Sequence, residues 1–428
     1  MIEKILLGKT PFGGEIYYLQ SDRPYDIPAV RIFVSVQKVM KEVFKEPIET
    51  VEEFIAYVNR HPEVSKPYVR KVLQYHHGDI GEMERYGFYI KAVSRLFTFL
   101  SWIPIGANRG IKGVGTELSL RYVEHKGFVD HRNGTLKRVE EESLALYRTL
   151  RNAKTAKEDA RYVLPLSTMT EEIIHIQIGR DLAKWANYLK NEPFEEARAV
   201  GEALSRWNEE ENGFSMPTAE MPASKMPLLS EDEDPQRILL KEFLAGKPGR
   251  IHYDPYTQAL VWNSRRSIAS FHQDVRNRQV YFWWPSWESV IEEEEFYTPP
   301  GIPAHLREAV QEHYRLLLEV SSNLFCRGET ERAVYATPLG KIMDLYCAIY
   351  GNRNIYETVM LRACMRAQLE IRRQYRLIAE SIKGDFPGKL GARCETERRC
   401  FEPRKELCPL YNRYVVGAQS LKGSELKI

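Results

Sequence analysis

The stretch Gly115-Thr-Glu117-Leu-Ser119-Leu-Arg121-Tyr122 places a carboxylate, a hydroxyl and a guanidinium at every second residue. Alternate side chains of an extended segment point to one face, so we expect Glu117, Ser119 and Arg121 to converge there. A hydroxyl and a guanidinium fork together suit a phosphate, while the carboxylate accepts from a sugar hydroxyl or holds the guanidinium in place. The stretch therefore indicates a ligand site, with an ordinary solvated strand as the alternative.

The charge balance of the whole chain argues against a nucleic-acid partner. Its 428 residues carry 61 basic and 59 acidic side chains, a formal net charge of +2, whereas nucleic-acid binders are usually basic. The longest apolar run, residues 96–105, contains Ser101 and Pro104 and is too short to cross a bilayer, so we expect no membrane partner. The first residues lack the apolar segment of a secretory signal, which predicts a cytoplasmic protein.

Residues 216–235 are rich in proline and then acidic, which predicts a linker, and a second copy of the pattern follows it. The first copy reads Arg109-Gly110-Ile111, seven residues, Ser119; the second reads His272-Gln273-Asp-Val-Arg276-Asn277-Arg278, seven residues, Ser286. Ser119 and Ser286 are 167 positions apart, and the later Pro165 and Pro338 are 173 apart. Two patterns in the same order predict an internal duplication.

Apolar spacing gives a coarse prediction of secondary structure. Residues 139–150, 170–190 and 304–324 carry apolar side chains at helical spacing, so helices are expected there. The run Val30 to Val36 is rich in β-branched residues, which favours a strand.

These motifs resemble the flavin-dependent thymidylate synthase (ThyX) family. The first stretch continues as E-L-S-x-R-Y, a form that the family's nucleotide-binding segment commonly takes, and the segment at 93–95 is similar to its v-S-R-a segment. Residues 159–168 are similar to its A-R-x-V-L-P-L-x-T segment, and residues 361–372 to its L-R-x-x-x-x-A-Q-W-E-I-R segment. The segment from His77 to Ile90 is similar to the family's H-x-S-x-x-E-H and F-x-I elements.

The resemblance implies an α+β fold built from two copies of a ThyX-like module, each a twisted, mainly antiparallel sheet packed with long helices. The first module would span residues 1–215 and keep the nucleotide-type motif. A linker at 216–235 would lead to the second module at 236–385, which keeps the flavin-type motif, and to a cysteine-containing tail at 386–428.

By the same resemblance, the site residues are divided between the modules. Arg362 would act on the pyrimidine ring as the catalytic residue, since its guanidinium can stabilise negative charge there. The substrate-binding residues would be Glu117, Ser119, Arg121, Tyr122 and Arg161. The cofactor-binding residues would be His272, Gln273, Arg276, Asn277, Arg278 and Ser286. One composite site for each pair of modules is expected, with its symmetry-related counterpart inactive.

The activity that the resemblance implies is methylation at C5 of a pyrimidine nucleotide, dUMP, with FAD as hydride carrier and NADPH and methylenetetrahydrofolate as co-substrates. The family's sites lie between the subunits of a homotetramer, so a homodimer of this chain would mimic that assembly. The departures at Gly110, Ile111 and Asn277 leave open a non-catalytic nucleotide-binding paralogue. The Trp283-Trp284-Pro285 segment, where a nucleotide contact is expected, would either fill the pocket with indole or offer a stacking surface for a different base or ring.

All six cysteines lie in the C-terminal third. Three of them, Cys326, Cys347 and Cys364, stand in apolar surroundings typical of buried thiols. The spacing of Cys394, Cys400 and Cys408 leaves three readings open: an iron–sulfur or zinc site completed by Cys364 or a histidine, a disulfide, or unmodified thiols. An iron–sulfur/flavin redox protein is therefore a third functional hypothesis.

Overall fold

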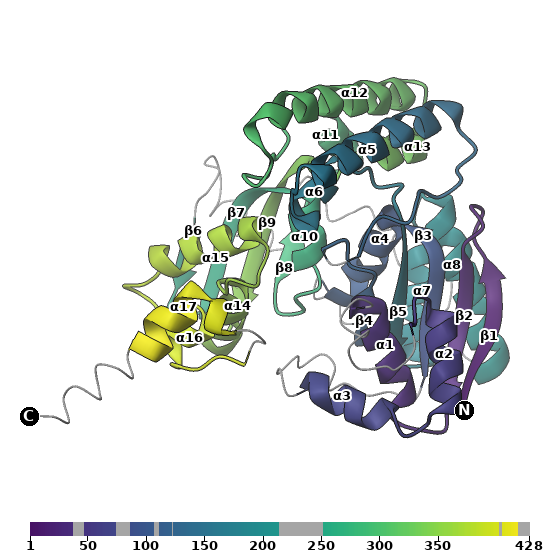
Figure 1. Ribbon diagram of the computed structural model, residues 1–428, viewed down its shortest axis with the longest axis horizontal. Coiled ribbons are helices and arrows are strands. Elements are labelled where there is room, and N and C mark those ends of the chain that lie inside the picture. Colours follow the sequence, from purple (N-terminus) through teal and green to yellow (C-terminus); the bar gives the residue numbers. More distant parts are fainter. Residues whose placement is uncertain are drawn as a thin grey trace, which may run out of the picture.

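A computed structural model describes residues 1–36, 47–73, 86–106, 111–121, 123–213, 251–401 and 405–417. It has an α+β fold with two antiparallel sheets (Figure 1). The first sheet has the strand order β1-β2-β3-β5-β4. Its strands are β1 (Ile2–Lys9), β2 (Glu15–Ser21), β3 (Tyr86–Ser94), β4 (Gly113–Glu117) and β5 (Met169–Ile176).

The second sheet repeats the topology of the first without its outer strand β1. Its order, β6-β7-β9-β8, matches the order β2-β3-β5-β4. The strands are β6 (Ile251–Asp254), β7 (Ala259–Ser267), β8 (Tyr281–Trp283) and β9 (Ile342–Tyr350). The duplication predicted from the sequence is thus present in the fold.

The principal helices also occur in matching pairs. After β3 and β7 come α4 (Arg95–Gly106) and α10 (Ile268–Asp274), and the long helices are α5 (Gly134–Asn152) and α12 (Arg307–Cys326). The last pairs are α7 (Arg180–Lys190) with α14 (Asn352–Arg362), and α8 (Glu195–Asn212) with α15 (Leu369–Ser381). In Figure 1, α5 and α12 lie together above the junction of the two modules. Shorter elements are α6 (Lys157–Ala160), η3 (Arg161–Val163), α11 (Trp287–Glu292), η4 (Ala304–Leu306), α13 (Thr330–Ala336), α16 (Arg393–Thr396), η5 (Lys405–Leu407), α17 (Pro409–Tyr411) and η6 (Asn412–Val416).

A local two-fold relation joins the modules at Pro165 and Pro338, which face each other in an isolated antiparallel bridge. On either side, the amide of Leu339 donates to the carbonyl of Leu164 and the amide of Leu166 donates to that of Thr337, both at 2.9 Å. Adding 173 to the first-module residue number and subtracting 173 from the second-module number converts each bond into the other. The bridge therefore marks the pseudo-symmetry axis.

The two sequence spacings, 167 and 173, now have a structural explanation. β5 and β9 correspond with a shift of 173, but Thr116 of β4 pairs with Ile173 while Trp283 of β8 pairs with Tyr346, a shift of 167 between the outer strands. The first module thus has six more residues than the second between the start of the helix (α4 or α10) and equivalent positions of the edge strand (β4 or β8), and most of them belong to the longer helix α4. One duplication accounts for both spacings.

A matching clamp closes the β–α junction of each module. In the first, the amide of Ser94 donates to Glu196 at 3.0 Å and the hydroxyl of Tyr335, from the second module, donates to Glu196 at 3.3 Å. In the second, the corresponding residues are Ser267, Glu370 and Tyr162, with bonds of 2.7 and 3.1 Å. Each clamp takes its tyrosine from the other module, so the clamps tie the modules together. A single hydrophobic core also runs through both.

The first module differs by an insertion between β2 and β3. It contains α1 (Asp26–Val36), α2 (Val51–Arg60) and α3 (Ser65–Leu73), whereas β6 and β7 are joined by a short turn. These helices bury a second hydrophobic core on their side of the first sheet, around Phe33, Phe54 and Tyr89.

Two secondary-structure predictions were wrong. Val30 to Val36 lies within helix α1, because residues 30–34 are buried between other helices and the sheet, and burial outweighs β-propensity. The helix expected over 170–190 begins only at Arg180, and Met169–Ile176 forms β5, an interior strand of the first sheet. Both faces of that strand are buried, so its apolar residues did not alternate in a way that distinguishes strand from helix. The helices expected at 139–150 and 304–324 are confirmed as α5 and α12. The linker at 216–235 lies outside the described residues.

Candidate functional site

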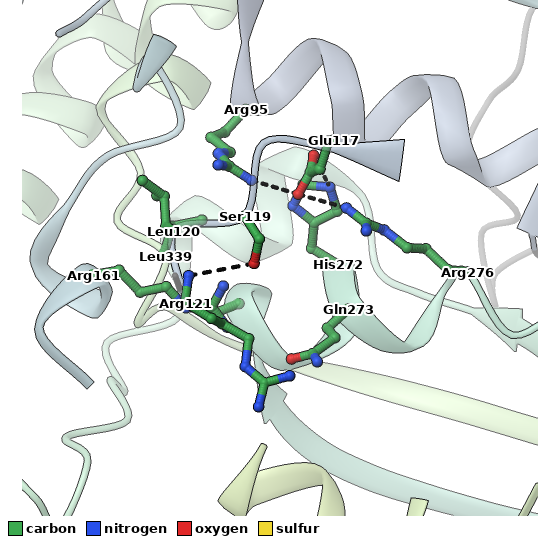
Figure 2. Close-up of a pocket in the computed structure, with 11 residues that line it drawn as sticks. Arg95, Glu117, Ser119, Leu120, Arg121, Arg161, His272, Gln273, Arg276 and Leu339 are labelled. Carbon is green, nitrogen blue, oxygen red and sulfur yellow. Dashed lines mark hydrogen bonds and ion pairs between the residues drawn. The ribbon is translucent and has the colours of Figure 1, made fainter. Parts of the chain in front are cut away.

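A cavity of about 170 Å³ lies between the two modules (Figure 2). Both modules contribute to its wall. The first module supplies Arg95, Glu117, Ser119, Leu120, Arg121 and Arg161, and the second supplies Ala269, His272, Gln273, Arg276 and Leu339.

The first-module residues come from the end of strand β4 and the turn that follows it. Glu117 is the last residue of β4, and the chain turns at Leu120 and Arg121. The extended segment predicted across the whole stretch therefore ends at Glu117. Glu117, Ser119 and Arg121 nevertheless face one cavity, as expected.

The second-module residues come from α10 and the residues just after it. His272, Gln273 and Arg276 are spaced so that they share one side of a helical turn. Figure 2 shows His272 and Arg276 beside Glu117, with Gln273 further along the same wall. The nucleotide-type and flavin-type motifs thus meet although about 155 positions separate them in the chain.

Glu117 is the buried centre of this charge cluster. Arg95 pairs with one side of its carboxylate, Arg276 Nη2 lies 2.5 Å from Oε1, and His272 Nε2 lies 3.2 Å from Oε2. Burial favours the neutral acid, but Arg95, His272 and Arg276 together outweigh it and hold the pKa of Glu117 well below its usual range. Burial also lowers the pKa of His272 in spite of Glu117, so its imidazole is neutral at pH 7. Glu117 is therefore a carboxylate held between two guanidinium groups.

Arg95 was not among the predicted site residues. It is the first residue of α4, is buried, and also donates to the carbonyl of Leu118, which fixes the turn after β4. The sequence did carry a signal for it, because Val93-Ser94-Arg95 is similar to a family segment. Burial lowers the pKa of Arg95 to about 10, so it remains a cation at neutral pH.

Arg121 and Arg161 connect the cavity to the loop between α14 and α15. Arg121 Nη2 donates to the carbonyl of Arg366 at 2.8 Å and pairs with Glu158 at 3.1 Å. Arg161 Nη2 donates to Oε1 of Gln368 at 2.7 Å. The loop between α14 and α15, which resembles the family's ring-binding segment, thus positions both guanidinium groups by accepting hydrogen bonds from them.

The lining has a strong excess of positive charge. It carries four guanidinium groups, those of Arg95, Arg121, Arg161 and Arg276, against the single carboxylate of Glu117. Among the described residues, no hydrogen-bond partner is present for the buried Oε1 of Gln273. A cavity with surplus guanidinium groups and an unsatisfied amide oxygen is suited to an anionic ligand that also has donor groups.

Several other predicted site residues lie outside the cavity lining. Arg362 Nε pairs at 3.1 Å with Oδ1 of Asp274, the last residue of α10. Ser286 caps α11 by accepting a hydrogen bond from the amide of Ser289. Asn277 donates to Thr358 at 3.4 Å, and Arg278 approaches the carbonyl of Gly113 at 3.5 Å. Their functional roles stay predictions. Tyr122 and the Arg109-Gly110 pair lie outside the described residues.

The cysteine predictions can be compared with the structure directly. None of the six cysteines forms a disulfide. Within the described ranges, no three His, Cys, Asp or Glu side chains stand close enough to bind a single metal ion.

The symmetry-related position of the cavity is filled with apolar side chains. With the shift of 173, Ile268 replaces Arg95 and Val334 replaces Arg161; with the shift of 167, Trp284 replaces Glu117. The counterparts of the α10 residues are Phe99, Leu100 and Ile103 on α4. All six are at most 1% exposed, and Phe99 and Trp287 pack edge to face with their ring centroids 6.0 Å apart. The first-module counterparts of His272 and Gln273 are thus apolar residues of α4. Arg109 and Gly110, which the sequence aligned with Arg276 and Asn277, lie outside the described residues, so that alignment stays a prediction.

The fold and the cavity define a duplicated α+β protein that, in the part of the chain that the structure describes, has a strongly basic cavity between its two halves. The sequence profile of the thymidylate synthase complementing protein matches residues 34–207 and 255–388, which together form more than half of the chain. The chain therefore belongs to this family, the flavin-dependent thymidylate synthases, as a tandem duplication. No curated protein matches the chain. In the described ranges, no helix has the length and hydropathy needed to cross a membrane.

Proposed function

We propose that the cavity binds the phosphate and sugar of a pyrimidine nucleotide, dUMP, and that the protein transfers a one-carbon unit to C5 of its ring with FAD as hydride carrier. The observation that supports this most directly is the convergence of four guanidinium groups, from both modules, on one cavity. Family membership supports the nucleotide class. NADPH and methylenetetrahydrofolate are the expected co-substrates, and a homodimer the expected assembly.

Ser119, Arg121 and Arg161 are the proposed phosphate ligands. Their hydroxyl and guanidinium groups can donate to several phosphate oxygens together, and such charge-assisted bonds are stronger than neutral ones. Gln368 and the carbonyl of Arg366 hold the two guanidinium groups from behind, which reduces the entropy lost on binding. Glu117 keeps Arg95 and Arg276 in place, and its carboxylate is an acceptor for a sugar hydroxyl.

His272, Gln273 and Arg276 are the proposed contacts to FAD. Arg276 supplies positive charge for a pyrophosphate, and the buried amide oxygen of Gln273 accepts from a ring N–H. Bound FAD would supply the hydride chemistry that amino-acid side chains lack. The cavity volume of about 170 Å³ is below the 300–1,000 Å³ typical of ligand pockets, which fits a sugar phosphate better than two whole ligands.

The role of Arg362 in stabilising charge on the pyrimidine ring is part of the proposal. The family resemblance supports it, and so does the neighbouring loop, which contacts Arg121 and Arg161. Arg362 itself is paired with Asp274, which also binds Arg266 at 2.7 Å and the hydroxyl of Tyr375 at 2.9 Å. Asp274 therefore sets where this guanidinium can point.

An absorbance spectrum from 300 to 700 nm, recorded before and after addition of dUMP, tests the proposal. We expect flavin bands in the purified protein and a shift of these bands with dUMP, because the proposed contacts to FAD adjoin the proposed contacts to the nucleotide. A protein that takes up no flavin, even after incubation with FAD, would contradict the enzyme version. A protein with flavin that ignores dUMP would contradict the nucleotide assignment.

A non-catalytic nucleotide-binding protein is the second candidate. It is favoured by the small cavity volume and by the position of Arg278 and Asn277 outside the lining. The two functions predict different results for Arg121→Ala and Arg276→Ala in titrations with dUMP and with FAD. If the protein is an enzyme, Arg121→Ala should lose dUMP binding and Arg276→Ala should lose flavin binding. If it is a non-catalytic binding protein, only Arg121→Ala should have an effect, the loss of dUMP binding. Arg138→Ala, on the exposed face of α5, is the matched control.

A further inference from the structure

Four of the six cysteines gather at one place on the second module. Cys394 is a buried residue of α16, and Cys364 and Cys400 pack against the small apolar cluster that it forms with Ala392 and Val415. Cys408 caps α17, which packs on α16. The four cysteines therefore lie in or beside one small apolar cluster.

The origin of these cysteines is informative. Three come from the tail, beyond residue 388 where the family match ends. They fold back onto Cys364, which lies in the loop between α14 and α15. Thiols needed only for packing would not have to meet, since a cysteine behaves as a small apolar residue wherever it is buried.

The metal centres that four cysteines can bind differ in the spacing they need. Zinc lies about 2.3 Å from each sulfur in a tetrahedron, so the sulfurs around one ion are about 4 Å apart. Among the described residues, no three such side chains are arranged to hold a single metal ion. An iron–sulfur cluster places iron and sulfide between its thiolates, so its four cysteines stand further apart than those of a zinc site.

The chemical surroundings favour an anionic centre. Residues 386–417 carry seven Lys or Arg and four Glu side chains, so the tail has a surplus of positive charge. A cluster with four thiolate ligands is negative, and nearby cations stabilise it. Cys408 is followed by Pro409, the Cys-Pro pair that also ends a common bacterial cluster-binding sequence.

We propose that Cys364, Cys394, Cys400 and Cys408 are the ligands of an iron–sulfur cluster. One proposed ligand, Cys364, is also close in sequence to two residues that contact arginines of the cavity. Cys364 is two residues before Arg366, whose carbonyl holds Arg121, and four before Gln368, which holds Arg161. The cluster would therefore fix the loop that positions these two arginines.

Metal analysis of the full chain, purified without oxygen, tests this proposal independently of any activity. We expect iron and acid-labile sulfide in equal amounts and little zinc. Cys364→Ser, Cys394→Ser, Cys400→Ser and Cys408→Ser should each lose most of the iron. Cys326→Ser, at the exposed end of α12, should keep it.

Three results would overturn the proposal. One is a protein that holds neither iron nor sulfide after anaerobic reconstitution with both. Another is stoichiometric zinc without sulfide, which would make the site a zinc site. The third is an iron content that the four serine variants leave unchanged. If a serine variant fails to fold, the analysis of the unmodified protein still decides between these outcomes.

Discussion

The cavity between the modules and its symmetry-related counterpart are built on the same backbone but have opposite interiors. At the working position, Arg95, Glu117 and Arg161 meet His272, Gln273 and Arg276. At the counterpart, Ile268, Trp284 and Val334 meet Phe99, Leu100 and Ile103, all buried. One position is thus a charged cavity and the other is ordinary core. In a symmetric dimer of identical chains both positions would have to be the same, so it is the fusion of two modules that permits this difference.

The difference also separates binding from stability. Four guanidinium groups around one carboxylate repel one another and are costly to bury, so the cavity lowers the free energy of unfolding. The counterpart has no such cost and contributes hydrophobic burial. We infer that hydrophobic burial at the counterpart position compensates for the electrostatic cost of the cavity.

The largest expected effect is that of Trp284→Ala. Trp284 is fully buried against Phe271, with ring centroids 5.5 Å apart, so its removal should lower the free energy of unfolding by about 3–5 kcal/mol. Nucleotide affinity should stay within a few-fold of the unmodified protein. Urea unfolding and a dUMP titration measure the two quantities, and the half-buried Trp207→Ala is the control. A loss of affinity without a loss of stability would show that the counterpart position is a site after all.

The next largest effect is expected from the clamp carboxylates, of which Glu196 belongs to the first module. Burial raises the pKa of Glu196 to about 7, above its ordinary 4.5, although bonds from Ser94 and Tyr335 act in the opposite direction. The folded protein therefore keeps a proton that the unfolded chain has lost. The stability contributed by this proton is complete below pH 4.5 and is lost as the pH rises through 7.

Glu196→Gln should remove that pH dependence. Relative to the variant, the unmodified protein should lose roughly 2–4 kcal/mol of unfolding free energy between pH 4.5 and 8. Urea unfolding across this range measures it, and Glu202→Gln, exposed on the same helix, is the control. Burial likewise raises the pKa of Glu370, so Glu370→Gln should change the pH profile in the same direction. Parallel profiles for the unmodified protein and Glu196→Gln would refute the assignment.

The smallest effect in free energy is expected when a residue of the cavity is replaced by its counterpart from the second module. Arg161→Val installs the residue of the second module and removes one phosphate contact, so dUMP affinity should fall roughly 100-fold, about 2.7 kcal/mol. Isothermal titration measures the change, with Arg138→Val as the control. If Arg161→Val binds dUMP as tightly as the unmodified protein, Arg161 is not a phosphate ligand.

The sequence was sufficient to predict the family, the α+β class and the duplication. These succeeded because each depends on short motifs in a fixed order. The clamp residues Glu196 and Tyr335 were not predicted, since a buried carboxylate and its tyrosine partner 139 positions later leave no local pattern. Strand β5 was misread because burial on both faces removes the alternation that marks a strand. Arg362 was placed by resemblance alone, and its pairing with Asp274 could be seen only in three dimensions.

The bridge at Pro165 and Pro338 has a consequence for how the chain unfolds. The amides of Leu166 and Leu339 beside it are bonded across the modules, within a core that both modules share. Neither amide can exchange with solvent unless the halves separate, and separation would expose that core. The two halves should therefore open in a single cooperative transition, and the slowest-exchanging hydrogens should lie at the centre of the molecule instead of in either sheet.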